Sequence, residues 1–238
     1  MNEPTNEPTT SVTASQPSRI LLIAPHADDE LFGAGASLLR WRDAGAQIHM
    51  LLVACSDVRM RHTGGVVTAA TRAAEFTKSA EAVSTTVPTI LWMNDARLDE
   101  QPLSALVSKL DDALDAFRPD LMLIPEPSYH QDHQYVNRAC VAALRPTGGA
   151  RPAKVLAYEV PTSTGIGSPA FSPTMYVNVS EQIERKAELL RQIYVSQYTA
   201  VERGGLAEHG MRRHASYRGA ECGVEFAEAY VVLRELVR

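Results

Sequence analysis

The chain has few cysteines and no hydrophobic run long enough to cross a membrane. Its three cysteines, Cys55, Cys140 and Cys222, are odd in number and lie far apart among 238 residues. This usage does not suit a disulfide framework and favours a reducing, cytoplasmic compartment. No apolar stretch approaches the ~18 residues of a transmembrane helix, so we expect no membrane span.

The sequence also lacks an excess of positive charge and a signal peptide. Its formal net charge is -5 at pH 7, which gives no electrostatic reason to expect nucleic acid as a partner. The N-terminus has no basic and apolar regions, repeats Asn-Glu-Pro-Thr at 2–5 and 6–9, and stays polar. We interpret residues 1–17 as a disordered tail. Residues 18–238 are enough for a single domain with a large core.

Apolar segments with the character of buried strands alternate with helical patterns. The first four predicted strands cover 20–23, 47–54, 89–93 and 121–125. The intervening helices are predicted at 33–45, 68–84 and 103–117. This alternation predicts a Rossmann-like, mostly parallel sheet with helices on both faces, a three-layer α/β/α architecture.

The pattern becomes less regular past residue 150. Further strands are predicted at 155–160, 175–179 and 229–233, with a helix around 183–193. The segment 203–223 is rich in Gly, Arg and His and has no assignment from its pattern. We therefore expect extra C-terminal strands and loops beside the parallel sheet.

A dense group of ionisable side chains follows the first predicted strand. His26, Asp28, Asp29 and Glu30 lie within five residues. Crowded carboxylates beside an imidazole are costly unless a cation neutralises them. A neutral histidine with aspartate suits a divalent metal, zinc first among the candidates. The alternative is that the acidic residues serve only to cap the helix that follows.

A second group, Tyr129-His130-Gln131-Asp132-His133, follows the fourth predicted strand. Loops that follow parallel strands of one sheet can converge at a topological switch point. His26, Asp29 and one of His130 or His133 would then supply three protein ligands and leave a fourth position for water, as a catalytic zinc site requires. Two such groups in one chain favour a metal site over capping alone, and the absence of cysteine from both favours a catalytic site over a structural one.

With these motifs the chain resembles the PIG-L/LmbE-like family of zinc-dependent N-acetylglucosamine N-deacetylases. The family motifs are usually Ala/Pro-His-Pro-Asp-Asp-Glu and His-Pro-Asp-His. Here residues 25–30 read Pro-His-Ala-Asp-Asp-Glu and residues 130–133 read His-Gln-Asp-His. Weaker family features follow the same order, namely Arg72-x-x-Glu75, Asn94-Asp95, Arg118-Pro119-Asp120, Tyr158-Glu159, Ser196-Gln197 and Ala227-Glu228-Ala229.

The resemblance implies a role for each motif residue. One Zn2+ per chain, or another divalent metal such as Fe2+ or Co2+, would be bound by His26, Asp29 and His133. Asp28 would be the general base acting on the metal-bound water. His130 would stabilise the developing oxyanion, and Asp132 would orient a neighbouring histidine.

The function implied is hydrolysis of the amide of an N-acetylated or N-acylated amino sugar, or of its small-molecule conjugate. Arg72 and Asp95 match positions that bind the sugar in some family members. The alternatives are a metal-dependent hydrolase of another amide or ester, and a non-catalytic sugar-binding member of the fold. Retention of Asp28 argues against the second alternative. The chain could also form a homo-oligomer.

The sequence departs from the family pattern at three places. Ala27 and Gln131 replace the prolines of the two motifs, and Ser128 stands where some members have a tyrosine, with Tyr129 next to it. We expect substrate recognition to involve the loops 56–67, 161–173 and 203–223. A further histidine, His49, lies inside a predicted strand, and we interpret it as a packed residue outside the site.

Overall fold

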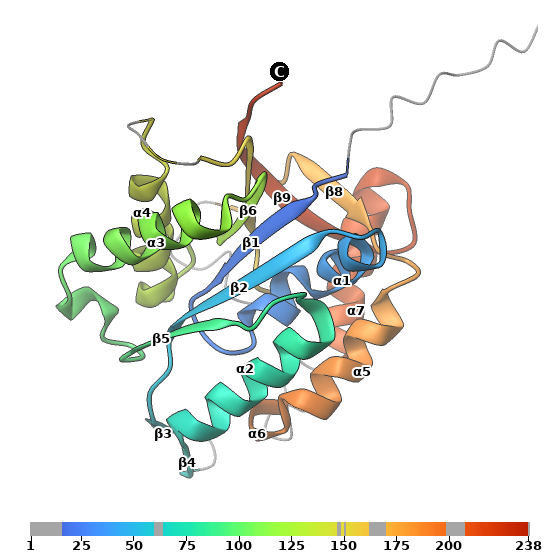
Figure 1. Ribbon diagram of the computed structural model, residues 1–238. Coiled ribbons are helices and arrows are strands. Elements are labelled where there is room, and N and C mark those ends of the chain that lie inside the picture. Colours follow the sequence, from blue (N-terminus) through green and yellow to red (C-terminus); the bar gives the residue numbers. More distant parts are fainter. Residues whose placement is uncertain are drawn as a thin grey trace, which may run out of the picture.

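The computed structural model describes residues 16–59, 64–146, 149, 151–161, 170–198 and 208–237. Most of the predicted tail 1–17 lies outside these residues. So do parts of the loops 56–67 and 161–173 and of the segment 203–223. The rest of the chain forms one central sheet with helices packed on its two faces (Figure 1).

The central sheet has seven strands in the order β5-β2-β1-β6-β7-β9-β8. In that order the strands are β5 Thr89–Met93, β2 Gln47–Ala54, β1 Arg19–Ala24, β6 Leu121–Pro125, β7 Lys154–Tyr158, β9 Ala227–Glu235 and β8 Met175–Asn178. The five strands from β5 to β7 are parallel, whereas β9 is antiparallel to both β7 and β8. The predicted mostly parallel sheet with extra C-terminal strands is therefore confirmed. A separate two-stranded sheet pairs β3 Val58–Arg59 with β4 Val66–Val67.

Helices cover both faces of the central sheet, which confirms the three-layer architecture (Figure 1). One face packs against α1 Asp29–Asp43, α2 Ala69–Val83, α5 Ile183–Ile193 and α7 Glu208–Cys222. The other face packs against α3 Leu103–Phe117 and α4 Gln131–Ala143. Two short helices, η1 Leu98–Glu100 and α6 Val195–Tyr198, lie in connections.

Strand β1 explains why the first apolar run has no polar alternation. Ile20 and Leu22 point into the core beneath α1 and α2, and Leu21 and Ile23 point into the core beneath α3 and α4. All four side chains are fully buried. A strand covered on both faces must be apolar throughout, as is usual in parallel sheets.

Helix α1 begins at Asp29, four residues earlier than the pattern predicts. The prediction placed the start at Gly33 because small residues there suggested the beginning of a helix. A Cβ at Gly33 would lie 2.2 Å from the Tyr158 ring and 3.1 Å from the Glu159 carbonyl oxygen. The glycine is therefore required by the close approach of α1 to the end of β7. The two carboxylates of Asp29 and Glu30 occupy the first helical turn, where the helix dipole favours negative charge.

The C-terminal part contains a helix that the pattern did not assign. Helix α7 occupies most of the segment 203–223. Its only described apolar side chains that join the core are Met211 and Ala215, and these give too weak a periodicity to identify a helix from sequence. The strand predicted at 155–160 is β7, which ends at Tyr158.

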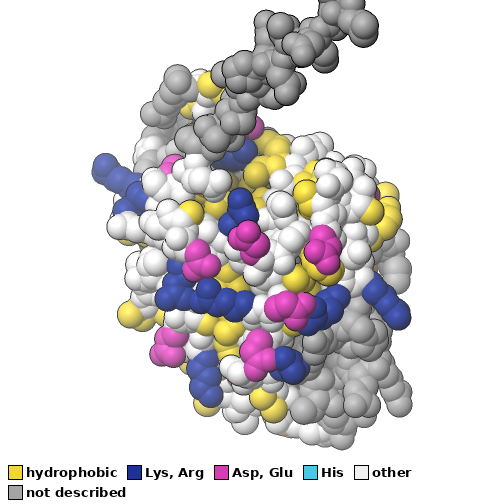
Figure 2. All heavy atoms as spheres, turned by 90° about the vertical axis from the view of Figure 1, so that its right-hand side faces the viewer, with side chains coloured by type: hydrophobic (Ala, Val, Ile, Leu, Met, Phe, Trp, Pro, Cys, Tyr) yellow, Lys and Arg dark blue, Asp and Glu magenta, His cyan; other side chains and the backbone are white. Residues whose placement is uncertain are grey.

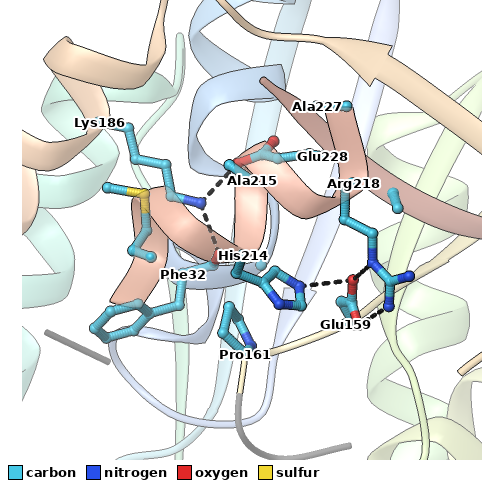
Figure 3. A pocket seen from close by; sticks show the side chains of 12 residues that line it. Phe32, Glu159, Pro161, Lys186, His214, Ala215, Arg218, Ala227 and Glu228 are labelled. Atoms are coloured by element: carbon cyan, nitrogen blue, oxygen red, sulfur yellow. Dashed lines mark hydrogen bonds and ion pairs between the residues drawn. The ribbon is translucent and has the colours of Figure 1, made fainter. Parts of the chain in front are cut away.

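A buried ion pair is hydrogen-bonded to the backbone of α1 (Figure 3). Lys186 Nζ lies 2.8 Å from Glu228 Oε1, and both side chains are buried. Lys186 donates a further hydrogen bond to the Phe32 carbonyl, and Glu228 accepts the backbone N–H groups of Ala36 and Ser37. In a regular helix the Phe32 carbonyl and the Ala36 N–H bond to each other. Side chains from α5 and β9 thus hold both ends of one hydrogen-bonded turn of α1.

The side of the molecule formed by α5 and α7 carries interspersed positive and negative side chains (Figure 2). Arg185 pairs with Asp43 at 3.3 Å, and Arg212 pairs with Glu184. Exposed pairs of this kind contribute about 0–1 kcal/mol each. No described helix is both long enough and apolar enough to cross a membrane.

Candidate metal centre

The topology brings the two sequence motifs together. Strands β1 and β6 are parallel neighbours, but the chain continues from β1 to β2 on one side and from β6 to β7 on the other. The loops that follow β1 and β6 therefore diverge at a topological switch point, where ligand sites form in open α/β sheets. The first loop leads into α1 and the second into α4.

Three side chains from these loops have donor atoms within 4.8 Å of one another: His26, Asp29 and His133. Asp29 Oδ2 lies 3.3 Å from His26 Nδ1 and 3.2 Å from His133 Nε2. Asp29 and His133 are buried. The sequence left His130 and His133 open as the third donor. The geometry groups His133 with His26 and Asp29, and it also brings His130 together with His26 and Asp132 within the same distance.

Asp132 contacts the opposite nitrogen of His26. Its Oδ2 atom lies 2.9 Å from His26 Nε2 and accepts the Ala96 N–H at 2.6 Å, while Oδ1 faces the Leu98 N–H at 3.4 Å. Backbone N–H groups of the loop after β5 thus hold the Asp132 carboxylate in place, and this carboxylate orients the His26 ring. When a metal is bound, a proton on Nε2 directed to Asp132 would leave the Nδ1 lone pair of His26 free for the ion. Carboxylate–histidine pairs of this kind orient metal-binding imidazoles.

The electrostatics of this cluster suit a cation. Burial disfavours a charge on His26, but hydrogen bonds to Asp132 and Asp29 and the field of nearby carboxylates raise its pKa to about 10. Burial opposes ionisation of Asp29, yet His133 and His26 hold its pKa well below the usual range. Asp28, Asp95 and Asp132 add further carboxylates, whereas Arg72 is the one guanidinium they approach among the described residues. Two imidazoles and a carboxylate are a donor set that fits zinc or a similar divalent metal.

His130 caps helix α4 with its side chain. Its Nδ1 atom accepts the Asp132 backbone N–H at 3.2 Å. The neutral ring therefore carries its proton on Nε2. Burial, together with the charges of His26 and His133, lowers the pKa of His130 and favours this neutral form. The ring centroid of His130 lies 4.7 Å from that of His26 and 5.4 Å from that of His133.

Asp28 occupies an unusual backbone conformation at the start of α1. Its φ and ψ angles are 129° and -30°, and conformations so rarely adopted by residues with a Cβ cost about 1–3 kcal/mol. Its side chain makes no cap hydrogen bond, so capping of α1 does not explain this carboxylate. Burial and the neighbouring carboxylates of Asp29 and Glu30 hold the pKa of Asp28 well above its usual range.

The buried Arg72 and the partly buried Asp95 form an ion pair at the edge of the site. Arg72 Nη1 lies 2.5 Å from Asp95 Oδ1 and donates to the Ser56 carbonyl at 3.3 Å. Asp95 Oδ2 accepts both the N–H and the hydroxyl of Ser56 at 3.0 Å. Asp95 Oδ1 is 3.9 Å from His26 Nε2. The two predicted sugar-binding residues therefore lie together beside the metal-binding cluster, and their contact with a sugar stays a prediction.

Three residues outside the predicted set support the second loop. The buried Ser128 hydroxyl accepts the His130 N–H at 3.1 Å, and Gln134 donates to the Ser128 carbonyl at 2.6 Å. Gln131, at the position of the family proline, donates to the Ala96 carbonyl at 3.3 Å. Polar side chains are common in loops, so the sequence carried no signal that singled out these contacts.

His49 lies outside the site, as predicted. Its ring nitrogens contact the hydroxyls of Thr86 and Thr89, and its ring packs 5.4 Å from that of Phe117.

A second charged cluster lies near the carboxyl end of β7 (Figure 3). Glu159 Oε1 lies 2.8 Å from His214 Nε2 and 2.7 Å from Arg218 Nε, and Oε2 lies 3.0 Å from Arg218 Nη2. Burial opposes ionisation of Glu159, but these hydrogen bonds lower its pKa. The cluster joins β7 to α7 and, with the Lys186–Glu228 pair, lines a cavity large enough for about one water molecule.

This geometry predicts a pH-dependent loss of stability in Glu159→Gln. A carboxylate with a lowered pKa stabilises the fold above its unfolded-state pKa, and this contribution disappears as the pH falls through the folded-state value. Glu159→Gln should reduce the free energy of unfolding by about 2 kcal/mol at pH 7, with a smaller difference below pH 4.5, the ordinary pKa of the group. Urea unfolding at several pH values measures the difference. The exposed Glu225→Gln is the matched control, and a difference independent of pH would contradict the assignment.

Comparison with known proteins connects this geometry to a family. A curated relative, 1D-myo-inositol 2-acetamido-2-deoxy-alpha-D-glucopyranoside deacetylase of Kineococcus radiotolerans, is 26% identical over an alignment of 188 residues. The alignment covers 61% of this chain and 52% of the relative. The chain thus spans about half the length of that relative.

Two solved structures show the same fold. N,N'-diacetylchitobiose deacetylase from Pyrococcus horikoshii has a TM-score of 0.75 at 20% identity, covering 91% of this chain and 84% of that one. The 4-carboxy-2-hydroxymuconate hydratase GalB from Pseudomonas putida has a TM-score of 0.68 at 15% identity, covering 93% of this chain and 98% of that one. At these identities the likeness concerns the fold alone, and the fold carries more than one chemistry.

The family model described as PIG-L, GlcNAc-PI de-N-acetylase, matches residues 21–144. The match spans more than half of the chain and includes both loops of the candidate metal centre. The chain therefore belongs to the PIG-L family.

Proposed function

We propose that the protein is a metal-dependent N-deacetylase that hydrolyses the acetamide of an N-acetylated amino sugar or of its small-molecule conjugate. The observation that carries this proposal is the convergence of His26, Asp29 and His133, with the His130 ring against His26 and with Asp28 directly before Asp29 in the chain. Family membership supports it, as do the names of two relatives, which act on an acetamido-glucopyranoside and on diacetylchitobiose.

His26, Asp29 and His133 are the residues that would hold the metal, with zinc as the preferred ion. Bound there, a divalent ion would lower the pKa of water and polarise the amide carbonyl. The chain's contribution is to keep the three donors in place. Asp132 does so for His26, and the first turn of α1 does so for Asp29.

Asp28 is the general base of the proposed reaction. Its carboxylate lies next to Asp29 and is not used in capping α1, so it is available to collect the proton of the attacking water. The same carboxyl group then returns that proton to the amine as the C–N bond breaks. A proton acceptor and donor at one position meets both needs of amide hydrolysis.

His130 is the proposed hydrogen-bond donor to the oxyanion. Its Nδ1 is already occupied by the Asp132 N–H, so Nε2–H is the group left to donate. A neutral imidazole at a helix N-terminus can supply this bond without losing its own proton. One such donor contributes about 100- to 1,000-fold to turnover. Beside it, Arg72 and Asp95 would bind the hydroxyl groups of the sugar.

An acetate-release assay tests the function. We expect equal amounts of acetate and free amine from at least one of N-acetylglucosamine, N,N'-diacetylchitobiose and N-acetylglucosaminyl-inositol. Dialysis against EDTA should abolish the release, and Zn2+, Fe2+ or Co2+ should restore it. An aryl acetate and an aryl phosphate serve as comparison substrates. Hydrolysis of these two alone, with all three amides untouched, would assign the site to another hydrolase class.

A further inference from the structure

Glu30 is a buried acidic residue of the first motif to which the proposed mechanism gives no task. Its side chain is fully buried and bonds to Ser79 of α2 and to Tyr194, which follows α5. Helices α1, α2 and α5 lie together on one face of the sheet (Figure 1). Burying a carboxylate is costly unless its oxygens are hydrogen-bonded. The hydrogen-bond partners of Glu30 therefore indicate the role of this buried carboxylate.

One carboxylate oxygen of Glu30 is anchored by two other helices. Oε1 accepts the Ser79 hydroxyl of α2 at 2.6 Å and the hydroxyl of Tyr194, the residue that follows α5. Both hydroxyl-bearing residues are fully buried. The carboxylate is thus held on this side by two buried hydroxyl groups from other parts of the chain.

The other oxygen of Glu30 faces the loop. Oε2 accepts the backbone N–H of Asp28 at 3.0 Å. Asp28 is the residue with φ of 129°, a value that a side chain with a Cβ rarely adopts. A strained residue of this kind persists only when its surroundings hold it. The bond from Glu30 acts directly on the peptide group whose rotation sets that φ angle.

We propose that Glu30 is a positioning residue, which holds Asp28 in its strained conformation and so sets the direction of the Asp28 carboxylate. Ser79 and Tyr194 are the anchor of this arrangement. The catalytic part of the inference rests on the proposed function, in which Asp28 is the general base. The conformational part can be tested without any substrate.

The strain at Asp28 can be measured by comparing Asp28→Gly with Asp28→Ala. Glycine adopts positive φ freely, whereas alanine retains the Cβ. While Glu30 is present, Asp28→Gly should melt about 2–4 °C above Asp28→Ala. Without the Glu30 bond the loop can relax, and the usual preference for alanine over glycine should return.

A triple variant removes the Glu30 bond without leaving buried hydroxyls unpaired. Glu30→Met, Ser79→Ala and Tyr194→Phe together replace the polar anchor with apolar groups of similar size, a change that is often nearly neutral for folding. Glu30→Gln is the conservative rescue, because its amide oxygen can still accept the Asp28 N–H. Glu81→Met places the same methionine substitution at an exposed position of α2 and serves as the control.

We expect Asp28→Gly to melt above Asp28→Ala when Glu30 is present, in the Glu30→Gln background and in the Glu81→Met control. In the triple variant this difference in melting temperature should disappear. In the triple variant kcat should fall about 10- to 100-fold, with KM within about 2-fold and metal content unchanged, and Glu30→Gln should recover most of the turnover. If Asp28→Gly still melted above Asp28→Ala in the triple variant, the inference would be overturned. Wild-type turnover of the triple variant would also overturn it. If the wild type releases no acetate, the proposed function fails and the melting comparison alone decides the role of Glu30.

Discussion

Asp28→Asn should bind metal as the wild type does and lose about 1,000-fold in turnover. The amide cannot accept the proton of the attacking water, and general-base catalysis contributes about 100- to 10,000-fold. The metal-binding set, His26, Asp29 and His133, does not include Asp28. Asparagine also keeps the size of the side chain, so the packing around α1 is unchanged. Acetate release and metal content, measured on the same preparation, give both quantities.

The control for this experiment is Asp112→Asn, the same substitution at an exposed position of α3. It should retain both metal and turnover. Asp28→Asn with turnover close to that of the wild type would remove Asp28 from the role of base. Loss of metal in Asp28→Asn would instead make Asp28 a ligand.

His133→Ala should lose both metal and turnover. It removes one of three donors whose atoms lie within 4.8 Å of each other, and it leaves the buried Asp29 carboxylate without one of its two imidazole neighbours. Loss of a partner that only orients a ligand costs about 10- to 100-fold in metal affinity. Removal of a ligand itself should cost more than about 100-fold. Metal content after dialysis and a competition titration with a zinc chelator measure the effect.

His49→Ala is the matched control, because His49 lies on β2 among Thr86, Thr89 and Phe117 and away from the cluster. Comparison of Asp28→Asn with His133→Ala separates the role of general base from that of metal ligand. Asp28→Asn should keep the metal, whereas His133→Ala should lose it. Wild-type metal affinity in His133→Ala would show that the three donors do not form the binding site.

The sequence predicts that the two motifs meet, because each motif is a short loop that follows a strand. The fully apolar run 20–23 identifies a strand buried on both faces, and the position of each motif directly after a strand predicts that they meet at one sheet edge. Within the second motif, the spacing of His130 and His133 did not distinguish the two rings. That distinction depends on the first turn of α4, where His130 turns back to cap the helix and His133 faces Asp29.

Features that depend on distant packing could not be predicted. Gly33 suggested the start of a helix, but its small size serves a contact with Tyr158, 125 residues further along the chain. The bond between Asp132 and His26 depends on the Ala96 N–H, supplied by a third loop. The sequence alone does not distinguish the role of Glu30 from those of Asp28 and Asp29. The distinction comes from the hydrogen bonds of Glu30 to Ser79 and Tyr194, which lie far along the chain.

The buried pair of Lys186 and Glu228 has a consequence for the order in which the molecule is completed. A ribosome makes α1 before β9, yet the carboxylate that accepts the Ala36 and Ser37 N–H groups belongs to β9. Until β9 is added, the ammonium group of Lys186 lacks the Glu228 carboxylate with which it pairs. The helix that carries Asp29 thus gains these contacts only after β9 has been made. A nascent chain still lacking β9 would present both metal-binding motifs before α1 is held in this way.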